Sequence, residues 1–244
     1  MRLHATDSIQ FLIGLLALFL GLACARIAAP EGWSGGLIAD NKLYIGTAQG
    51  EILALDLDTG DTVRKEEGKL WKFSIPEREG EERSRSIYGT PAISNNTLFV
   101  GGYDGVLYAL SLDLNDIKGT ERLGGSIVGG PSVADNIVIV GSSDGNLYAF
   151  DVTEEIEGRV IFNQKWRFST GHKIWSRPVV SGDAVYFGSM DHNIYALALE
   201  TGDQLWKFET EGAIVASPLI LKDRLFVGSF DRNFYSIDSE TGEE

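Results

Sequence analysis

One pattern of apolar and polar residues recurs five times along the chain, and it predicts short β-strands separated by turns. Each copy holds an apolar run that ends in glycine, then a polar turn, then a second run typical of a half-buried strand. The first copy reads LYIGTAQGEILALD at 43–56 and the last reads LFVGSFDRNFYSID at 225–238. Between them lie LFVGGYDGVLYALS at 98–111, VIVGSSDGNLYAFD at 138–151 and VYFGSMDHNIYALA at 185–198. Such self-similarity indicates an array of repeated structural units.

Several columns of these copies carry one residue type. The fourth residue is always glycine, at Gly46, Gly101, Gly141, Gly188 and Gly228. Ten residues before it, four copies have a proline, namely Pro91, Pro131, Pro178 and Pro218. The same four copies have an aspartate three residues after the glycine and a tyrosine seven residues after it. The first copy departs from all three columns, with Gly36, Gln49 and Leu53.

Each copy resolves into four predicted strands. A short apolar run follows the proline, and a polar turn such as Asn95-Asn96 leads into the run that ends in glycine. The next turn is Asp-Gly in two copies, and glycine accepts the positive φ of a two-residue hairpin. A fourth strand follows at 70–73, 165–168 and 205–208, each with tryptophan in second position. Four antiparallel strands in about 40 residues predict an all-β fold, a β-propeller in which the five repeats are blades.

The first 25 residues have the features of an export signal. Arg2 supplies a positive charge, and the apolar run at 11–22 is shorter than the roughly 20 residues that a membrane-spanning helix needs. The small residues that follow suit cleavage after position 25, and they equally suit a lipoprotein signal with Cys24 as the acylated residue. An uncut anchor is a third alternative. We therefore expect a signal peptide or lipoprotein signal at 1–25, the repeats at 26–244, and a periplasmic or membrane-anchored location in the cell envelope.

Composition narrows the classes of partner. The net charge of −14 opposes binding to nucleic acid and to anionic lipid surfaces, so we expect contact with the membrane only through a lipid or N-terminal anchor. The single cysteine permits neither an intramolecular disulfide nor a cysteine zinc site. The three histidines are scattered, and we expect no metal site.

The outer part of the repeat carries a family signature. Residues 196–206 follow the pattern A-x-D-x-x-T-G-x-x-x-W, except that Ala198 replaces the aspartate, and residues 54–60 follow its first half. With these motifs, the chain from about residue 33 to 244 resembles the PQQ-like β-propeller repeats of quinoprotein dehydrogenases, BamB-like lipoproteins and sensor proteins. The resemblance implies that the tryptophans of the fourth strands pack between neighbouring blades, namely Trp71, Trp166 and Trp206.

The family resemblance also raises the question of blade number. Propellers of this family usually have seven or eight blades, whereas five repeats are visible here. We favour an incomplete propeller. The alternative is a five-bladed ring, closed by a strand at 26–28.

Two sets of loops are predicted to share one face of the blades: the loops before each proline and the aspartate turns. Three residues before the proline column lie Trp33, Tyr88, Val128, Trp175 and Val215. Arg177 precedes a proline, and His192 and Arg232 replace glycine in two aspartate turns. We expect a ligand or partner face formed by Trp33, Tyr88, Trp175, Arg177, His192 and Arg232. Alternatively, these side chains only cover the blade tops and pair locally, Arg232 with Asp231 for instance.

The same face is expected to hold the charged segment 77–85, EREGEERSR, which is either a solvated loop or a partner contact.

Three functions are compatible with these features. The first is an exported, non-catalytic, BamB-like scaffold that binds a protein partner in the cell envelope. The second is a fragment of a PQQ-dependent dehydrogenase, which would need PQQ, a calcium ion and an aspartate base. No calcium-binding motif is evident, and the hairpin aspartates are explained by turn chemistry, so we expect neither cofactor nor catalytic residue. The third is a ligand-sensing propeller domain.

Overall fold

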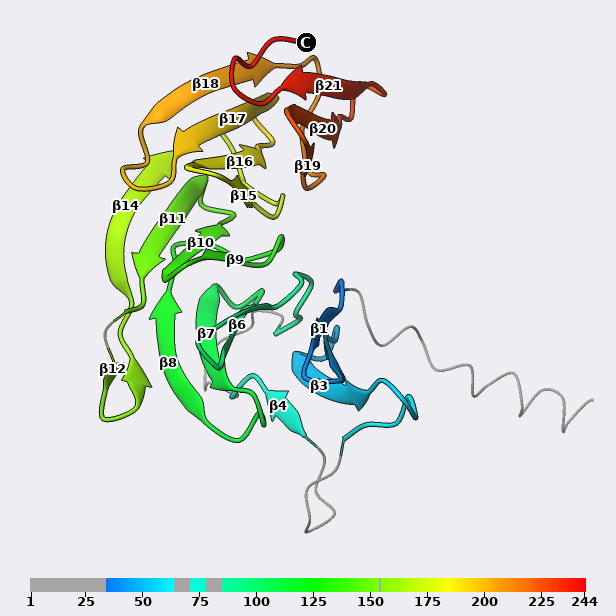
Figure 1. Ribbon diagram of the computed structural model, residues 1–244, viewed down its shortest axis with the longest axis vertical. Helices are drawn as coiled ribbons and strands as arrows, with labels where there is room; N and C mark the ends of the chain where they lie inside the picture. Colours follow the sequence, from blue (N-terminus) through cyan, green and yellow to red (C-terminus); the bar gives the residue numbers. More distant parts are fainter. Residues whose placement is uncertain (1–33, 64–70, 78–84, 154) are drawn as a thin grey trace, which may run out of the picture. The chain divides into compact units, whose positions relative to one another are not determined.

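The computed structural model describes residues 34–63, 71–77, 85–153 and 155–244 (Figure 1). The described residues belong to one compact unit, Gly32–Glu244. The predicted signal segment with Cys24, the proposed closing strand at 26–28 and Trp33 lie outside the described residues. Within the described part, no helix is long and apolar enough to cross a membrane.

The repeats form antiparallel sheets whose strands lie side by side in chain order, as predicted (Figure 1). Blade one contains β1 (Leu37–Ala39), β2 (Lys42–Gly46), β3 (Glu51–Asp56) and β4 (Lys72–Ser74). Blade two contains β5 (Ala92–Ser94), β6 (Thr97–Gly101), β7 (Val106–Ser111) and β8 (Ile117–Arg122). Blade three contains β9 (Ser132–Ala134), β10 (Ile137–Gly141), β11 (Asn146–Asp151) and β14 (Asn163–Ser169).

Blade four contains β15 (Val179–Ser181), β16 (Ala184–Gly188), β17 (Asn193–Ala198) and β18 (Gln204–Glu209). Blade five is a three-stranded sheet of β19 (Leu219–Leu221), β20 (Arg224–Gly228) and β21 (Phe234–Asp238). A short hairpin that the repeat pattern did not predict, β12 (Glu155–Ile156) and β13 (Arg159–Val160), precedes the fourth strand of blade three.

A hydrogen bond between an aspartate and a tyrosine holds the turn between the second and third strands of blades two to five. The tyrosine hydroxyl donates to the aspartate Oδ2 over 2.7–2.9 Å in the pairs Tyr108–Asp104, Tyr148–Asp144, Tyr195–Asp191 and Tyr235–Asp231. Each aspartate Oδ1 also accepts the backbone N–H two residues later. The aspartate and the tyrosine of the repeat therefore recur together because they form one hydrogen-bonded pair. The geometry of the turn accounts for the aspartates.

Blades one to four each pack one face against the next blade in the chain. Four apolar clusters are formed in this way, one for each pair of successive blades. Ile52 of the first blade belongs to one cluster with Leu98 and Val100 of the second, and Ile194 of the fourth belongs to one cluster with Leu225 of the fifth. Burial of these side chains between blades provides most of the stabilisation, as in other repeat proteins.

An isoleucine covers the recurring glycine at each of these four junctions. The pairs are Ile87 on Gly46, Ile127 on Gly101, Ile174 on Gly141 and Ile214 on Gly188. A Cβ atom on any of these glycines would lie closer than 3.0 Å to the isoleucine, so only glycine leaves enough space. Each isoleucine is fully buried and lies four residues before the proline, in an Ile-x-x-x-Pro segment. The glycine column therefore marks a contact between blades.

Trp166 and Trp206, on the fourth strands of blades three and four, reach the following blade, as the family resemblance implied, whereas Trp71 directly precedes β4 and is partly buried against the cluster between blades one and two. Trp166 Nε1 donates to the Leu199 carbonyl over 2.8 Å, and the indole ring lies directly against Gly202 of blade four. Trp206 repeats this arrangement with the Ser239 carbonyl at 3.0 Å and Gly242. The Thr-Gly part of the family signature thus includes the glycine on which the preceding blade's tryptophan packs.

Blade two lacks this tryptophan and fills the position differently. Ala149 and Ala196 pair with the tryptophans of their blades, whereas the equivalent Ala109 pairs with Gly119. The Val160 carbonyl and the Phe162 ring, both from the segment around β13, lie against Gly119. An insertion in blade three therefore supplies the aromatic group that blade two lacks.

Burial and hydrogen bonding oppose each other at Asp191. Burial disfavours the carboxylate, but hydrogen bonds from Gly171 N–H, the Tyr195 hydroxyl and Asn193 outweigh burial and lower the pKa of Asp191. Burial and the neighbouring Asp191 raise the pKa of Tyr195. The pair is therefore most stable as a carboxylate and a neutral phenol.

We expect Tyr195→Phe to lower the free energy of unfolding by about 1 kcal/mol at pH 7, since the carboxylate retains other donors. Stability from Asp191 is complete above its unfolded pKa of about 3.9 and is lost as pH falls through the lower folded pKa. Stability from Tyr195 is complete below about pH 10 and is lost as pH rises through its raised folded pKa. At both the acidic and the alkaline end of the range, the free energy of unfolding of the Tyr195→Phe variant should fall less than that of the wild type. Urea unfolding between pH 2 and 11 measures this difference.

Tyr88→Phe is the control for this experiment, because Tyr88 packs by its ring against Tyr103 and not in an aspartate turn. It should have the pH profile of the wild type. Identical profiles for all three proteins would show that the Asp191–Tyr195 pair contributes nothing.

Candidate partner-binding face

The loops that the sequence assigned to one face do meet. We call the segment between the fourth strand of one blade and the first strand of the next a connector. In blades two to five, the residue before each turn aspartate donates its backbone N–H to a connector carbonyl over 2.9–3.1 Å. The pairs are Tyr103 to Ser86, Ser143 to Ser126, Met190 to Lys173 and Phe230 to Ala213. Each aspartate turn is therefore bound to the connector that enters its own blade.

Trp175 lies at the junction of two blades on this face. Its Nε1 donates to Ser143 Oγ over 2.9 Å, which ties the connector of blade four to the aspartate turn of blade three. Lys173 Nζ lies 5.5 Å from the centre of the indole ring, close enough for a cation–π contact. The ring is half-buried, so one part is held by the protein and another is accessible. Lys173 was not among the predicted site residues, although it lies only two positions before Trp175.

Arg177 is fixed by its neighbours on both sides. Its Nε donates to the Pro131 carbonyl over 3.0 Å and to Ser132 Oγ over 3.1 Å. Its backbone N–H donates to Ser217 Oγ over 2.9 Å. The terminal amino groups form no hydrogen bond within the described part of the chain. Burial lowers the pKa of Arg177, yet an arginine stays charged at neutral pH. The side chain thus presents a positioned cation with open donors.

His192 and Arg232 occupy the glycine position of their aspartate turns. Both have positive φ angles, 74° and 78°, which glycine adopts without strain. Both side chains are exposed. No ion pair between Arg232 and Asp231 occurs among the described residues, and Asp231 Oδ2 instead accepts from Tyr235 and from Glu211 N–H.

Tyr88 lies on the connector of blade two, where its ring meets Tyr103 edge-on with the centroids 5.4 Å apart. Trp33 is outside the described residues. The structure places Trp175 and Arg177 on one connector. In the part of the chain that it describes, neither forms a hydrogen bond with the side chain of Tyr88, His192 or Arg232. The complete ring remains a prediction.

The ends of the charged segment 77–85 lie close together. Arg85 forms an ion pair with Glu77 at 2.9 Å, in which the Glu77 side chain is 83% exposed and the Arg85 side chain 42%. Residues 78–84 between them lie outside the described residues. The choice between a solvated loop and a partner contact therefore remains a prediction.

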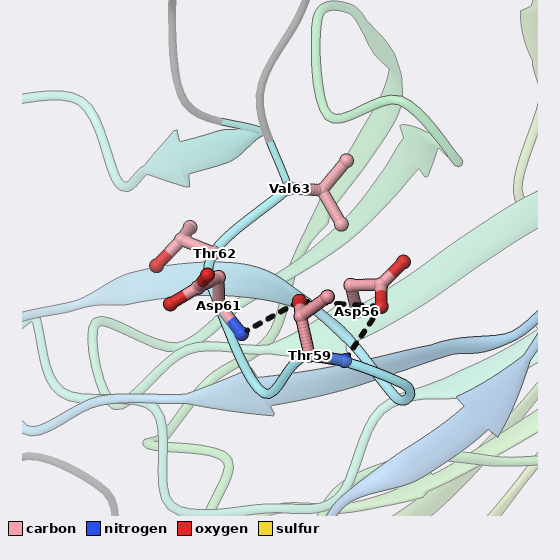
Figure 2. A pocket seen from close by; sticks show the side chains of 5 residues that line it. All are labelled: Asp56, Thr59, Asp61, Thr62 and Val63. Atoms are coloured by element: carbon pink, nitrogen blue, oxygen red, sulfur yellow. Dashed lines mark hydrogen bonds between the residues drawn. The ribbon is translucent and has the colours of Figure 1, made fainter.

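A hollow of about 560 Å³ lies at the outer turn of blade one and is lined by the five residues drawn in Figure 2, namely Asp56, Thr59, Asp61, Thr62 and Val63. The backbone N–H of Thr59 donates to Asp56 Oδ1 over 3.0 Å, and this bond is the main cause of the lowered pKa of Asp56. Thr59 Oγ1 accepts the N–H of Asp61. Asp238 and Thr241 form the same turn in blade five. These carboxylates therefore serve a repeated turn, and we assign no ligand to the hollow.

A second hollow, of about 410 Å³, lies between blades one and two. Lys42 Nζ lies 4.9 Å from the centre of the Trp71 ring there, and the Tyr44 hydroxyl donates to the Leu112 carbonyl over 3.0 Å. Burial, with Asp40 and Asp113 nearby, raises the pKa of Tyr44. Tyr186 makes the same bond to Ser239 between blades four and five, so the contact belongs to the repeat.

No group of three histidine, cysteine, aspartate or glutamate side chains suited to a metal ion occurs among the described residues.

A family model described as outer membrane protein assembly factor BamB matches residues 31–164 and 153–244. The chain belongs to this family of PQQ-like repeats. No curated protein matches the chain. Membership in this BamB family explains the recurring tryptophan and Thr-Gly positions that were visible in the sequence.

Two solved structures show the same fold. The crystal structure of BamB from Moraxella catarrhalis superposes with a TM-score of 0.68 at 19% sequence identity, over 87% of this chain and 62% of that one. The computationally designed protein Ika8 superposes with a TM-score of 0.63 at 18% identity, over 86% of this chain and 59% of that one. The chain thus spans about three fifths of either structure.

Proposed function

We propose that this protein is an exported, non-catalytic scaffold of the cell envelope that binds an acidic, extended segment of a partner protein. The observation that carries the proposal is the cluster of Lys173, Trp175 and Arg177 on one connector. Aromatic and arginine side chains fixed by neighbours are the usual anchors of protein interfaces, since little entropy is lost when a partner binds them. Membership in the BamB family supports the envelope location and the scaffold role.

Charge favours an acidic partner. The chain as a whole carries −14, but Lys173 and Arg177 lie on the connector that enters blade four, and Arg232 lies in the aspartate turn of blade five. Lys173 and Arg232 are exposed, and Arg177 keeps open donors that match the two oxygens of a carboxylate. An acidic surface around a basic patch would guide an acidic segment to that patch and away from other faces.

The recurring aspartates support a non-catalytic role. A catalytic base or calcium ligand must keep its oxygens available. Here, the turn aspartates direct both carboxylate oxygens to a tyrosine hydroxyl and to backbone N–H groups.

The test uses the tagged full-length protein and a fluorescent peptide of six glutamates with one tryptophan. We expect the double variant Trp175→Ala/Arg177→Ala to bind this peptide at least tenfold more weakly than the wild type. The double variant Leu205→Ala/Lys207→Ala is a matched control, since both side chains are exposed on the outer strand β18. It should bind like the wild type, and a glutamine peptide should bind neither protein.

Equal binding of the glutamate peptide by the wild type and the Trp175→Ala/Arg177→Ala variant would overturn the proposed face. The partner itself is sought by mild crosslinking in the native envelope. An envelope protein recovered with the wild type and with the control, but not with the Trp175→Ala/Arg177→Ala variant, would support the scaffold role.

A further inference from the structure

The hollow between blades one and two lies at a junction where the repeat departs from its pattern. At two later junctions, Trp166 and Trp206 are 7% and 9% exposed, and each lies against a turn glycine of the following blade. Trp71 holds the same position in blade one, but blade two has Asn115 where blades four and five have that glycine. The Trp71 side chain is only half-buried, and it lines the hollow.

The turn of blade two explains this difference. Leu114 adopts a positive φ of 57° there, and its side chain is buried in the cluster between blades one and two. The turn therefore offers the indole ring no flat glycine surface. Trp166 Nε1 and Trp206 Nε1 donate to backbone carbonyls, whereas Trp71 Nε1 forms no hydrogen bond in the part of the chain that the structure describes. Trp71 thus combines a partly accessible ring with an open donor.

The polar side chains around this hollow have both donors and acceptors to offer. Asp40, Asn96 and Asp116 line it and are exposed, and their side chains form no hydrogen bond with other described residues. Lys42 and Lys118 each use one ammonium donor within the protein, on a backbone carbonyl and on a threonine hydroxyl. An ammonium group has three donors, so both lysines retain others. The hollow therefore resembles a ligand site in which a few polar groups surround an aromatic ring.

Charge and volume narrow the class of ligand. Three carboxylates, of Asp40, Asp113 and Asp116, face two ammonium groups, of Lys42 and Lys118. A strongly acidic or strongly basic ligand would meet like charges here, whereas a neutral ligand with many hydroxyl groups can both donate to the carboxylates and accept from the lysines. The volume of about 410 Å³ lies within the range of roughly 300–1,000 Å³ that small-molecule sites have.

A smaller hollow of about 220 Å³ adjoins the first. The two share Ser111, Asp116 and Lys118, and the smaller one is also lined by Arg159 of the β12–β13 hairpin. Arg159 Nη1 donates to the Ile117 carbonyl over 3.1 Å, which holds the hairpin beside β8. Two adjoining hollows suit an elongated ligand better than a single compact one.

We infer that these adjoining hollows bind a neutral oligosaccharide of β-linked, glucose-type units, one ring of which packs on Trp71. Such a ring has C–H groups on its flat faces, which pack on an indole, and hydroxyl groups at its rim, which form hydrogen bonds. Lys42 Nζ lies 4.9 Å from the centre of the indole ring, and its flexible stem lets it move aside and donate to a hydroxyl. The lining residues among those described belong to neither a connector nor an aspartate turn, so this site is separate from the proposed partner face.

The probes are cellotetraose and N-acetylated chitotetraose, titrated into the full-length protein by isothermal calorimetry. We expect saturable binding of at least one of them. Trp71→Leu should weaken that binding at least tenfold, because leucine keeps apolar packing between the blades but lacks the indole. Asp116→Ala should weaken it at least threefold, and this variant should fold normally because the side chain is exposed.

Asp203→Ala is the matched control, since Asp203 holds the position of Asp116 in the turn of blade four and is also exposed. Trp175→Ala tests independence from the partner face. Both variants should bind the oligosaccharide like the wild type. The inference is overturned if neither oligosaccharide binds, or if Asp116→Ala binds with wild-type affinity. It is equally overturned if a peptide of six glutamates or six lysines displaces the bound oligosaccharide, because the hollow would then serve a charged ligand.

Discussion

Trp166→Ala is expected to lower the free energy of unfolding by about 3–5 kcal/mol, the usual cost of removing a buried tryptophan. The ring is 7% exposed, its Nε1 donates to the Leu199 carbonyl, and it lies against Gly202. Alanine removes this contact between blades three and four and leaves the Leu199 carbonyl without its donor. Urea unfolding followed by far-ultraviolet circular dichroism measures the loss.

Trp175→Ala is the matched control. Trp166 lies on β14, and Trp175 lies on the connector that follows this strand. Trp175 is half-buried and contacts a turn rather than the core. We expect a loss of about 1 kcal/mol or less, within the range of surface substitutions that break one hydrogen bond. Similar losses from the two variants would contradict the distinction between a tryptophan that joins blades and one that serves a binding face.

Gly188→Ala and Gly228→Ala should differ sharply, although they change the same column of the repeat. A methyl group on Gly188 enters the space of Ile214, a fully buried side chain, and such overpacking costs about 1–3 kcal/mol. A methyl group on Gly228 comes no closer than 3.9 Å to its nearest neighbour. The second variant should stay within about 0.5 kcal/mol of the wild type.

Thermal unfolding is a convenient measure of this difference. A loss of 2 kcal/mol in a chain of this size lowers the unfolding midpoint by about 4–8 °C. Gly228→Ala should unfold at the wild-type temperature. If both variants lost the same stability, the glycine column would reflect backbone conformation and not contact between blades.

These expectations rest on one property of repeat proteins: each unit is stabilised mainly by its neighbours. Blade-to-blade contacts such as Ile174 on Gly141 are therefore the energetic links of the array.

Local sequence determined the blades. Alternation within 98–111 or 185–198, together with Asp-Gly turns and fixed glycine positions, was sufficient to predict strands, antiparallel pairing and the propeller repeat. The same pattern indicated that the connectors and the aspartate turns share a face, because in an antiparallel sheet alternate turns lie at the same end. The tryptophan positions followed from the family resemblance.

Only the tertiary structure decided which residues meet across blades. The pairing of Ile214 with Gly188 joins positions 26 residues apart, and nothing local to either reveals it. Gly119 of β8 breaks the tryptophan pattern, and its cover comes from Phe162 of the next repeat, so the sequence pattern did not locate the fourth strand of blade two. The role of Arg177 likewise depends on Pro131, which lies 46 residues away. The periodic pattern predicts each strand from residues that are close in sequence. Packing between blades, in contrast, depends on contacts that form only when the repeats are stacked.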